Sequence, residues 1–185
     1  MSKFVHLHTH SHYSLLDGLS KVPELVGQAK AFGMEAVALT DHGNLYGAVE
    51  FYKAAKNAGV KPILGCELYL TPGSRHDKRA KIDDTRYHLP VLVKNETGWK
   101  NLLQLITKSH LEGFYYKPRV DKELLQEHHE GLICLSGCFS GEIPKLLYQG
   151  KKEEARKAAE FYHDLFGEDF YIEIQPHNEP GVQAA

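Results

Sequence analysis

The sequence predicts an α/β fold, in which short buried strands alternate with amphipathic helices. Runs of apolar and β-forming residues predict strands at residues 4–10, 35–42, 62–70, 88–94, 131–136 and 170–175. Helical spacing of apolar residues predicts helices at residues 22–32, 47–58, 97–112 and 121–129 and within 141–166. Strands separated by helices favour a parallel sheet, which is either open and doubly wound or closed into a barrel.

Each helical prediction rests on apolar residues that recur every three or four positions and so share one helix face. They are Val22, Leu25, Val26 and Ala29 in the first helix, Val49, Tyr52 and Ala55 in the second, and Leu102, Leu105 and Ile106 in the third. Gly59 marks the end of the second helix. The polar segment 71–87 is too long for a plain turn, so we expect either a mobile flap or a loop that contacts substrate.

Composition limits the class of protein. With 185 residues, 42% of them hydrophobic, the chain can form one domain, residues 1–185, with its own core. No apolar run approaches the roughly 20 residues that span a bilayer, so we expect no membrane partner. The formal charge of -2 excludes a global basic field. Three cysteines without a C-x-x-C pair argue against a disulfide framework, so we expect a soluble, cytoplasmic protein.

Histidines near the start of the chain predict a metal site. In FVHLHTHSHYSLLDG, His6, His8 and His10 alternate with strand-forming residues, and His12 and Asp17 follow. A strand repeats every two residues, so the first three imidazoles should share one face. Imidazole is the commonest protein ligand for zinc-like ions, and carboxylates complete such sites. The alternative, a solvated strand face that happens to carry histidine, is disfavoured by the strict alternation.

Further ligand-type residues lie in or next to the later strands. Asp41 and His42 end the second strand, where the alternative is a turn closed by an Asx-type bond. Glu67 lies in an apolar run, so its carboxylate must be paired, protonated or metal-bound, and it could bridge two cations. Cys138 suits zinc, but a lone cysteine beside a strand also suits plain packing. His88 opens its strand, at the edge opposite to the strand ends.

The number of ligand-type residues favours catalysis over a structural metal. A structural zinc needs four closed ligands, usually rich in cysteine, whereas this chain offers more than four candidates with few thiols. Two or three divalent ions could hold a phosphate ester and generate a metal-bound hydroxide as the nucleophile. We expect no catalytic residue beyond the metal ligands. Glu173 and His177 are weaker candidates.

Several motifs resemble a known family. HLHTHSHYSLLDG, ALTDHGNLYGAVEFYKAAKNAGVKPILGCELYL, YHLPVLVKN and GLICLSGC, in this order, resemble the polymerase-and-histidinol-phosphatase (PHP) domain over essentially the whole chain. LEGFYYKPRVDKELLQEHHEGLICLSGC resembles the branch found in bacterial replicative DNA polymerase III alpha subunits. The resemblance implies a distorted (β/α)7 barrel with up to three divalent ions, for which zinc and manganese are both suitable.

The same resemblance implies a set of metal ligands. By motif they are His8, His10, Asp17, His42, Glu67, His88 and Cys138, of which His88 and Cys138 rest mainly on the resemblance. His6 occupies a place where many relatives carry Asp, so it is left as a residue that could support the ligands. The family's last D-x-H motif is not found after Glu173. We therefore expect a domain truncated before its last strand, without two of the ligands.

Two functional hypotheses follow from the resemblance. The first is a metal-dependent phosphoesterase that acts as a 3′–5′ exonuclease on DNA 3′ ends, within a longer polymerase chain that serves DNA replication. The second is a non-catalytic scaffold that stabilises the polymerase and docks a separate proofreading exonuclease subunit. The intact ligand set favours the first. A free-standing histidinol-phosphate phosphatase is disfavoured by the polymerase-type residues from Phe114 to Pro118.

Overall fold

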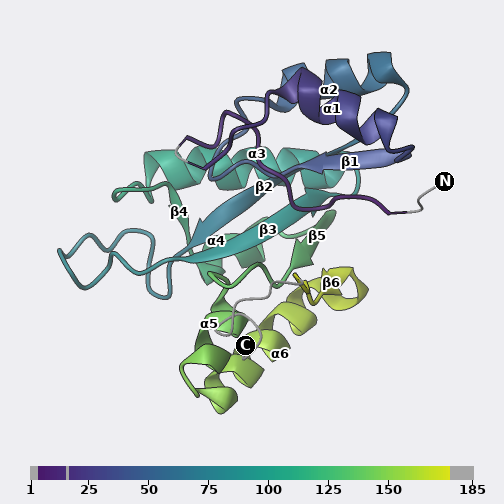
Figure 1. Ribbon diagram of the computed structural model, residues 1–185. Coiled ribbons are helices and arrows are strands. Elements are labelled where there is room, and N and C mark those ends of the chain that lie inside the picture. Colours follow the sequence, from purple (N-terminus) through teal and green to yellow (C-terminus); the bar gives the residue numbers. More distant parts are fainter. Residues whose placement is uncertain (1–3, 16, 176–185) are drawn as a thin grey trace. The chain divides into compact units, whose positions relative to one another are not determined.

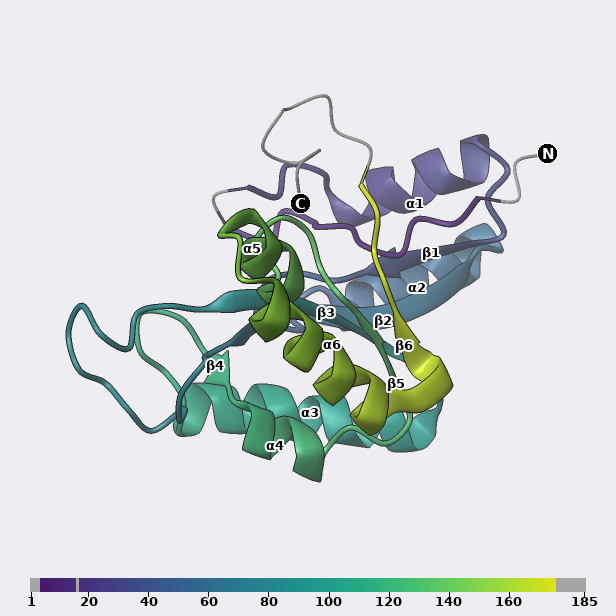
Figure 2. The ribbon, with the colours of Figure 1, turned by 90° about the horizontal axis from the view of Figure 1, so that it is seen from below.

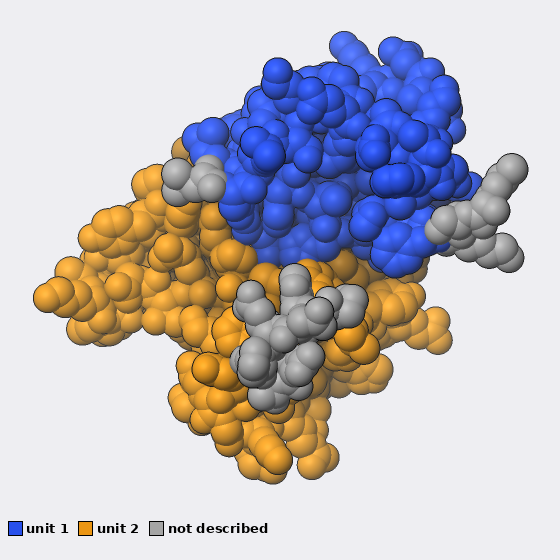
Figure 3. Space-filling view, viewed as in Figure 1, with its two compact units in different colours: residues 1–67 blue, residues 68–185 orange. Residues whose placement is uncertain are grey.

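The computed structural model describes residues 4–15 and 17–175, which form alternating helices and strands as predicted (Figures 1 and 2). The chain divides into two compact units, residues 1–67 and 68–185, which Figure 3 shows in different colours. Strand β2 (Lys61–Leu70) crosses the boundary between them. None of the described helices is both long enough and apolar enough to traverse a bilayer.

Unit 1 is built around one parallel strand pair. Its elements are α1 (Val22–Ala31), β1 (Ala36–Leu39), α2 (Ala48–Ala58) and the first part of β2. β1 pairs with β2 from Ala36↔Lys61 to Leu39↔Leu64. The helices α1 and α2 lie side by side (Figure 1) and bury an apolar cluster that includes Val22, Val26, Val37, Leu39, Phe51 and Ala55. α2 ends at Gly59, as predicted, because its φ of 76° is in the left-handed region that glycine adopts without strain.

The prediction of a regular strand at residues 4–10 is wrong, because the segment pairs with β1 irregularly. The segment runs beside β1, since Ala38 N–H donates to the His6 carbonyl at 2.9 Å and Thr40 N–H donates to the Thr9 carbonyl at 2.8 Å. His6 and Thr9 are three residues apart, whereas their partners are two apart. One extra residue therefore breaks the alternation, and His6 is exposed, with its ring against that of Phe4.

Unit 2 contains the remaining elements. They are β3 (Tyr87–Val93), α3 (Glu96–Leu111), β4 (Arg119–Val120), α4 (Lys122–Glu127), β5 (Leu132–Leu135), α5 (Glu142–Tyr148), α6 (Lys152–Phe166), a 3-10 turn (Gly167–Asp169) and β6 (Phe170–Tyr171). β2, β3, β5 and β6 are neighbours in this order, and β4 pairs with the end of β2. The helices α5 and α6 run side by side and pack on β3 and β5 (Figures 1 and 2).

The sheet is mixed, which corrects the expectation of parallel strands. β3 is antiparallel to β5, with Val91 opposite Cys134, whereas β5 and β6 are parallel. The reason lies in the connection before β3, which is the polar segment rather than a helix. A helical crossover is what normally returns the chain for a parallel strand, and a loop imposes no such direction. The sequence missed β4, because two residues are too few for a periodic pattern.

Helix boundaries in unit 2 follow side-chain caps and one glycine. Asn95 accepts a hydrogen bond from Gly98 N–H at the start of α3, and Asp121 accepts one from Leu124 N–H at the start of α4. The predicted helical region 141–166 is two helices. Gly150, with φ 75°, stands between them, since a left-handed residue cannot continue a right-handed helix.

A buried arginine fastens the polar segment that follows β2. Arg119 is 0% exposed, and its guanidinium donates to the carbonyls of Gly113, Arg75, Asp77 and Asp83 at 2.7–3.0 Å. Nearby, the Arg75 side chain donates to Asp121 at 3.0 Å and to Glu112 at 2.7 Å. The fastened backbone argues against a mobile flap, and contact with substrate stays a prediction.

Replacing Asp121 by Asn should destabilise unit 2 in a pH-dependent way. Burial raises the pKa of Asp121, but hydrogen bonds from Arg75 and Leu124 N–H and the Arg75 charge bring it below its ordinary value. The ionised form therefore contributes stability above the unfolded-state pKa of about 4, which is lost as pH falls through the folded-state pKa. We expect the variant to lose about 3 kcal/mol at pH 7, and less as pH falls below about 4.

Urea denaturation at pH 7, and again below about pH 4, measures this difference in the free energy of unfolding. Glu123→Gln is the matched control, because the Glu123 carboxylate also faces Arg75, at 3.5 Å, but is largely exposed. An exposed pair contributes little, so this variant should unfold like the wild type. An equal loss in both variants, or a loss independent of pH, would contradict the assignment.

Candidate metal centre

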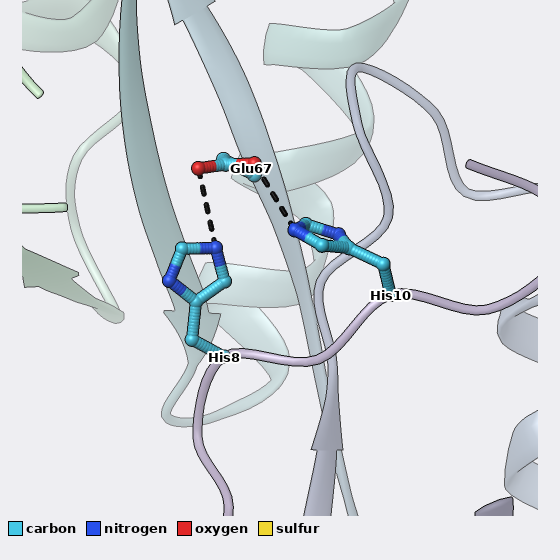
Figure 4. Close-up of side chains that lie close together, drawn as sticks. All are labelled: His8, His10 and Glu67. Carbon is cyan, nitrogen blue, oxygen red and sulfur yellow. Dashed lines mark ion pairs between the residues drawn. The ribbon is translucent and has the colours of Figure 1, made fainter. Parts of the chain in front are cut away.

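A buried carboxylate at the end of unit 1 is the centre of the candidate site. Glu67 lies in β2 and is 1% exposed. Its Oε1 lies 3.2 Å from His8 Nε2, and its Oε2 lies 3.3 Å from His10 Nε2. Figure 4 shows both imidazoles, from the N-terminal segment, directed at the two oxygens of the one carboxylate. Segments far apart in sequence therefore deliver three ligand-type groups to one point.

His42 joins the same carboxylate to a second one. It follows β1 and forms an isolated parallel bridge with Glu67. Its Nδ1 lies 2.6 Å from Glu67 Oε2, and its Nε2 lies 2.6 Å from Asp17 Oδ2. The His42 ring also stacks on that of His10, with centroids 4.2 Å apart. All five residues expected from the sequence in unit 1 are thus brought together.

The surroundings shift two of these imidazoles in opposite directions. Burial, followed by the charge of His42, lowers the pKa of His10, although Glu67 opposes this. Burial also lowers the pKa of His42, but hydrogen bonds and charge from Glu67 and Asp17 outweigh it and raise the pKa. A histidine between two carboxylates binds a proton readily, whereas a lowered pKa keeps His10 neutral, the form that ligates metals.

The donor set fits a divalent ion. Imidazole nitrogen and carboxylate oxygen are the ligands that zinc and manganese accept. Two ligands at about 2.1 Å from one ion stand about 3.0–3.4 Å apart at octahedral or tetrahedral angles. The Glu67 oxygens lie at 3.2 and 3.3 Å from the two N-terminal imidazoles. One ligand atom from each of His8, His10 and Glu67 lies within 4.8 Å of the others.

A second buried carboxylate positions the ligand-bearing turn. Asp41 accepts hydrogen bonds from Ser11 N–H at 2.6 Å and from the hydroxyls of Ser11 and Ser14 at 2.8 Å. Ser14 Oγ in turn accepts from His42 N–H at 3.0 Å. The partners of the Asp41 carboxylate thus come from a distant segment, whereas the alternative considered from the sequence was a local Asx-type bond. No sequence pattern indicated the serines, because serine is common in any turn.

Glycine is required where this turn closes. Gly18 N–H donates to the Ser14 carbonyl at 2.8 Å, and a Cβ at Gly18 would lie 1.8 Å from the Ser11 carbonyl oxygen. Any side chain would therefore push the turn away from the strand end that it contacts. His12 takes no part in the cluster as described; its ring packs on Tyr13.

The other two expected ligands, His88 and Cys138, belong to unit 2, and their part in a metal site stays a prediction. Because β3 is antiparallel to β5, the start of β3 adjoins the end of β5, and His88 N–H donates to the Ser140 carbonyl at 3.0 Å. His88, although it opens its strand, therefore lies at the edge of the sheet where β5 ends. Cys138 and Glu173 both line a cavity of about 190 Å³ in this unit. His177 lies outside the described residues.

Comparison with known proteins identifies the family. The protein-family model described as "PHP domain" matches residues 6–177, which include parts of both units. The chain belongs to the PHP-domain family. This agrees with the α/β fold class expected from the sequence, the distorted (β/α)7 barrel of the PHP type.

Curated relatives match nearly all of this chain. "DNA polymerase III subunit alpha" of Treponema pallidum is 56% identical over 176 residues, and that of Borreliella burgdorferi is 50% identical over 177. The alignments cover 94% and 95% of this PHP-domain chain but 15% of each relative. The chain thus spans about 15% of the length of these relatives.

One solved structure is more distant. It is described as a two-domain protein containing a predicted PHP-like metal-dependent phosphoesterase, from Bacteroides vulgatus. It is 19% identical, with a TM-score of 0.44, over 79% of this chain and 41% of that chain.

Replacing Asp41 by Ala should lower the free energy of unfolding by about 3 kcal/mol, because the buried donors of Ser11 and Ser14 lose their acceptor. Asp41→Asn keeps one carbonyl acceptor, so we expect a smaller loss, about 1 kcal/mol. Urea unfolding followed by circular dichroism measures both variants. If Ala and Asn cost the same, the hydrogen bonds to the carboxylate are not what holds the turn.

Proposed function

We propose that this PHP domain is a metal-dependent phosphoesterase that removes nucleotides from DNA 3′ ends. The observation that carries the proposal is Glu67, a fully buried carboxylate faced by three imidazoles. Such a group is costly to bury unless cations or hydrogen bonds compensate it. A cluster with more nitrogen and oxygen donors than one structural ion needs supports a site with two or three ions, in which Glu67 could bridge two of them.

The roles proposed for the residues follow from their contacts. His8 and His10 would hold one ion together with Glu67, and His42 and Asp17 would add donors beside it. His88 and Cys138 complete the proposed ligand set on the resemblance. Bound ions would supply a water molecule of lowered pKa and neutralise the phosphate ester. Asp41 keeps the turn that bears Asp17 and the segment that bears His10 attached to the end of β1.

The relatives support the biological setting of this proposal. The curated relatives that cover nearly all of this chain are named as alpha subunits of DNA polymerase III. We propose that the domain serves DNA replication in the bacterial cytoplasm as part of such a chain. Its partners would then be the remainder of the polymerase chain, the DNA 3′ end and a proofreading exonuclease subunit.

The second candidate function is a scaffold without catalysis, which stabilises the polymerase. The donor set around Glu67 argues against it, because a purely structural domain has no need to bury a carboxylate among imidazoles. The two functions give different results in one experiment. A scaffold that keeps its ions would bind metal and leave DNA intact.

Metal content and hydrolysis test the proposal together. Wild type, Glu67→Gln and His8→Ala are loaded with zinc or manganese, their bound metal is measured by mass spectrometry, and a 3′-labelled single strand is added. We expect Glu67→Gln to lose most of the bound metal and to slow hydrolysis at least a hundredfold, because the proposed bridging charge is gone. His8→Ala should lose about tenfold or more in metal affinity.

His6→Ala is the matched control for His8→Ala. It removes the same imidazole two residues earlier, from an exposed position outside the cluster. We expect its metal content and hydrolysis to equal those of the wild type. Hydrolysis that survives in Glu67→Gln, or a wild type that binds metal without cleaving DNA, would rule out the catalytic proposal.

A further inference from the structure

Two segments of unit 2, residues 75–86 and 113–118, form a surface with no part in the metal cluster of unit 1. Arg119 joins them, because its guanidinium donates to the carbonyls of Asp83 and Gly113 at 2.8 and 3.0 Å. We call residues 75–86 and 113–118 the Arg119 surface. We propose that it binds single-stranded nucleic acid, with Lys81 on a phosphate and Tyr116 stacked on a base.

The backbone singles out these two residues. Among the described residues, Lys81 and Tyr116 are the non-glycine residues with positive φ, 63° and 58°. Side chains other than glycine are strained there, and such strain persists where the surroundings enforce it, often at ligand-binding points. Both strained positions lie in the two segments that Arg119 joins. Each holds its side chain toward solvent, and Tyr116 is 69% exposed.

The segments are held in place before any ligand arrives. Arg119 also donates to the carbonyls of Arg75 and Asp77, and Tyr115 N–H donates to the Lys117 carbonyl at 3.0 Å. This last bond closes the turn that carries Tyr116 at its tip. Ordering a loop in advance reduces the entropy lost on binding. The backbone that carries Tyr116 and the backbone that carries Lys81 are therefore ordered before a ligand binds.

The charge of the Arg119 surface suits a polyanion. Arg79 pairs with two of its acidic side chains, Asp83 at 2.8 Å and Asp77 at 3.7 Å. Lys78 and Lys81 have no ion pair among the described residues. Arg86 and Lys117 lie 5.9 and 5.5 Å from the Tyr69 ring centroid, and they add two more cations. Asp84 is the acidic side chain of the two segments that stays outside these pairs.

Exposed aromatic rings select the class of nucleic acid. Tyr116 lies 4.6 Å from the Tyr115 ring, and Phe114 is also exposed. Bases stack on such rings when they are unpaired, whereas in a duplex the faces of the internal bases are covered by their neighbours. Cations interleaved with aromatic rings are the pattern of single-strand binding. Such binding is separate from the proposed hydrolysis and requires no metal.

Fluorescence anisotropy with a labelled oligothymidylate of about 12 nucleotides, in EDTA, tests the proposal. We expect Tyr116→Gly to weaken binding about tenfold without changing the salt dependence, because stacking is lost. Lys81→Gly should lower the slope of log affinity against log salt by about 0.7, the value for one single-strand phosphate contact. Both variants should unfold at or above the wild-type temperature, since glycine relieves the positive φ.

Tyr52→Ala and Lys56→Ala are the matched controls. They remove an exposed tyrosine and a lysine 5.9 Å from its ring, but on the regular helix α2. Both should bind DNA like the wild type. The proposal is overturned if the wild type does not bind, if Tyr116→Gly binds as well as the controls, or if a duplex of the same length competes equally. The first outcome would leave the surface to a protein partner.

Discussion

The buried carboxylate of Glu67 is the constraint on which unit 1 depends. A lone ionised carboxylate in the protein interior costs several kcal/mol, so the fold must bring compensating groups to it. It does so from two places, the N-terminal segment with His8 and His10 and the end of β1 with His42. The parallel pairing of β1 with β2 sets the last of these, because it places the residues after β1 opposite the end of β2. The register of β1 against β2 therefore determines where His42 lies relative to Glu67.

Among the described residues of unit 1, the carboxylates of Asp41 and Glu67 are both buried, and they differ in the groups that face them. Asp41 is faced by N–H and O–H groups, which can only donate to it, so its charge is satisfied by hydrogen bonds alone. Glu67 is faced by imidazole nitrogens, each of which can be a donor, an acceptor or a metal ligand. The first arrangement is complete without an ion. The second has the donors of a metal site. For this reason we assign Asp41 a supporting role and Glu67 a role as a proposed metal ligand.

The sequence predicted the alternation of strands and helices and five residues of the unit 1 cluster, because both depend on local periodicity and on the cost of burying charge. It failed for His6, where one extra residue between His6 and Thr9 ends the two-residue repeat. It also failed for the direction of β3, which depends on the path of a loop that has no periodicity. The serines that support Asp41 could not be found either, since their importance comes from a contact about thirty residues away along the chain.

Arg119 shows why a basic motif need not be a basic surface. In YYKPR the arginine is the most obvious candidate for a phosphate contact, yet it is fully buried, and burial lowers its pKa. Its N–H groups are taken up by backbone carbonyls, which satisfy the donors and leave a cation inside the unit. Because those carbonyls belong to two separate loops, the buried charge fixes both loops at once. The backbone of both loops therefore has a defined position, which Arg119 sets although its own side chain is buried.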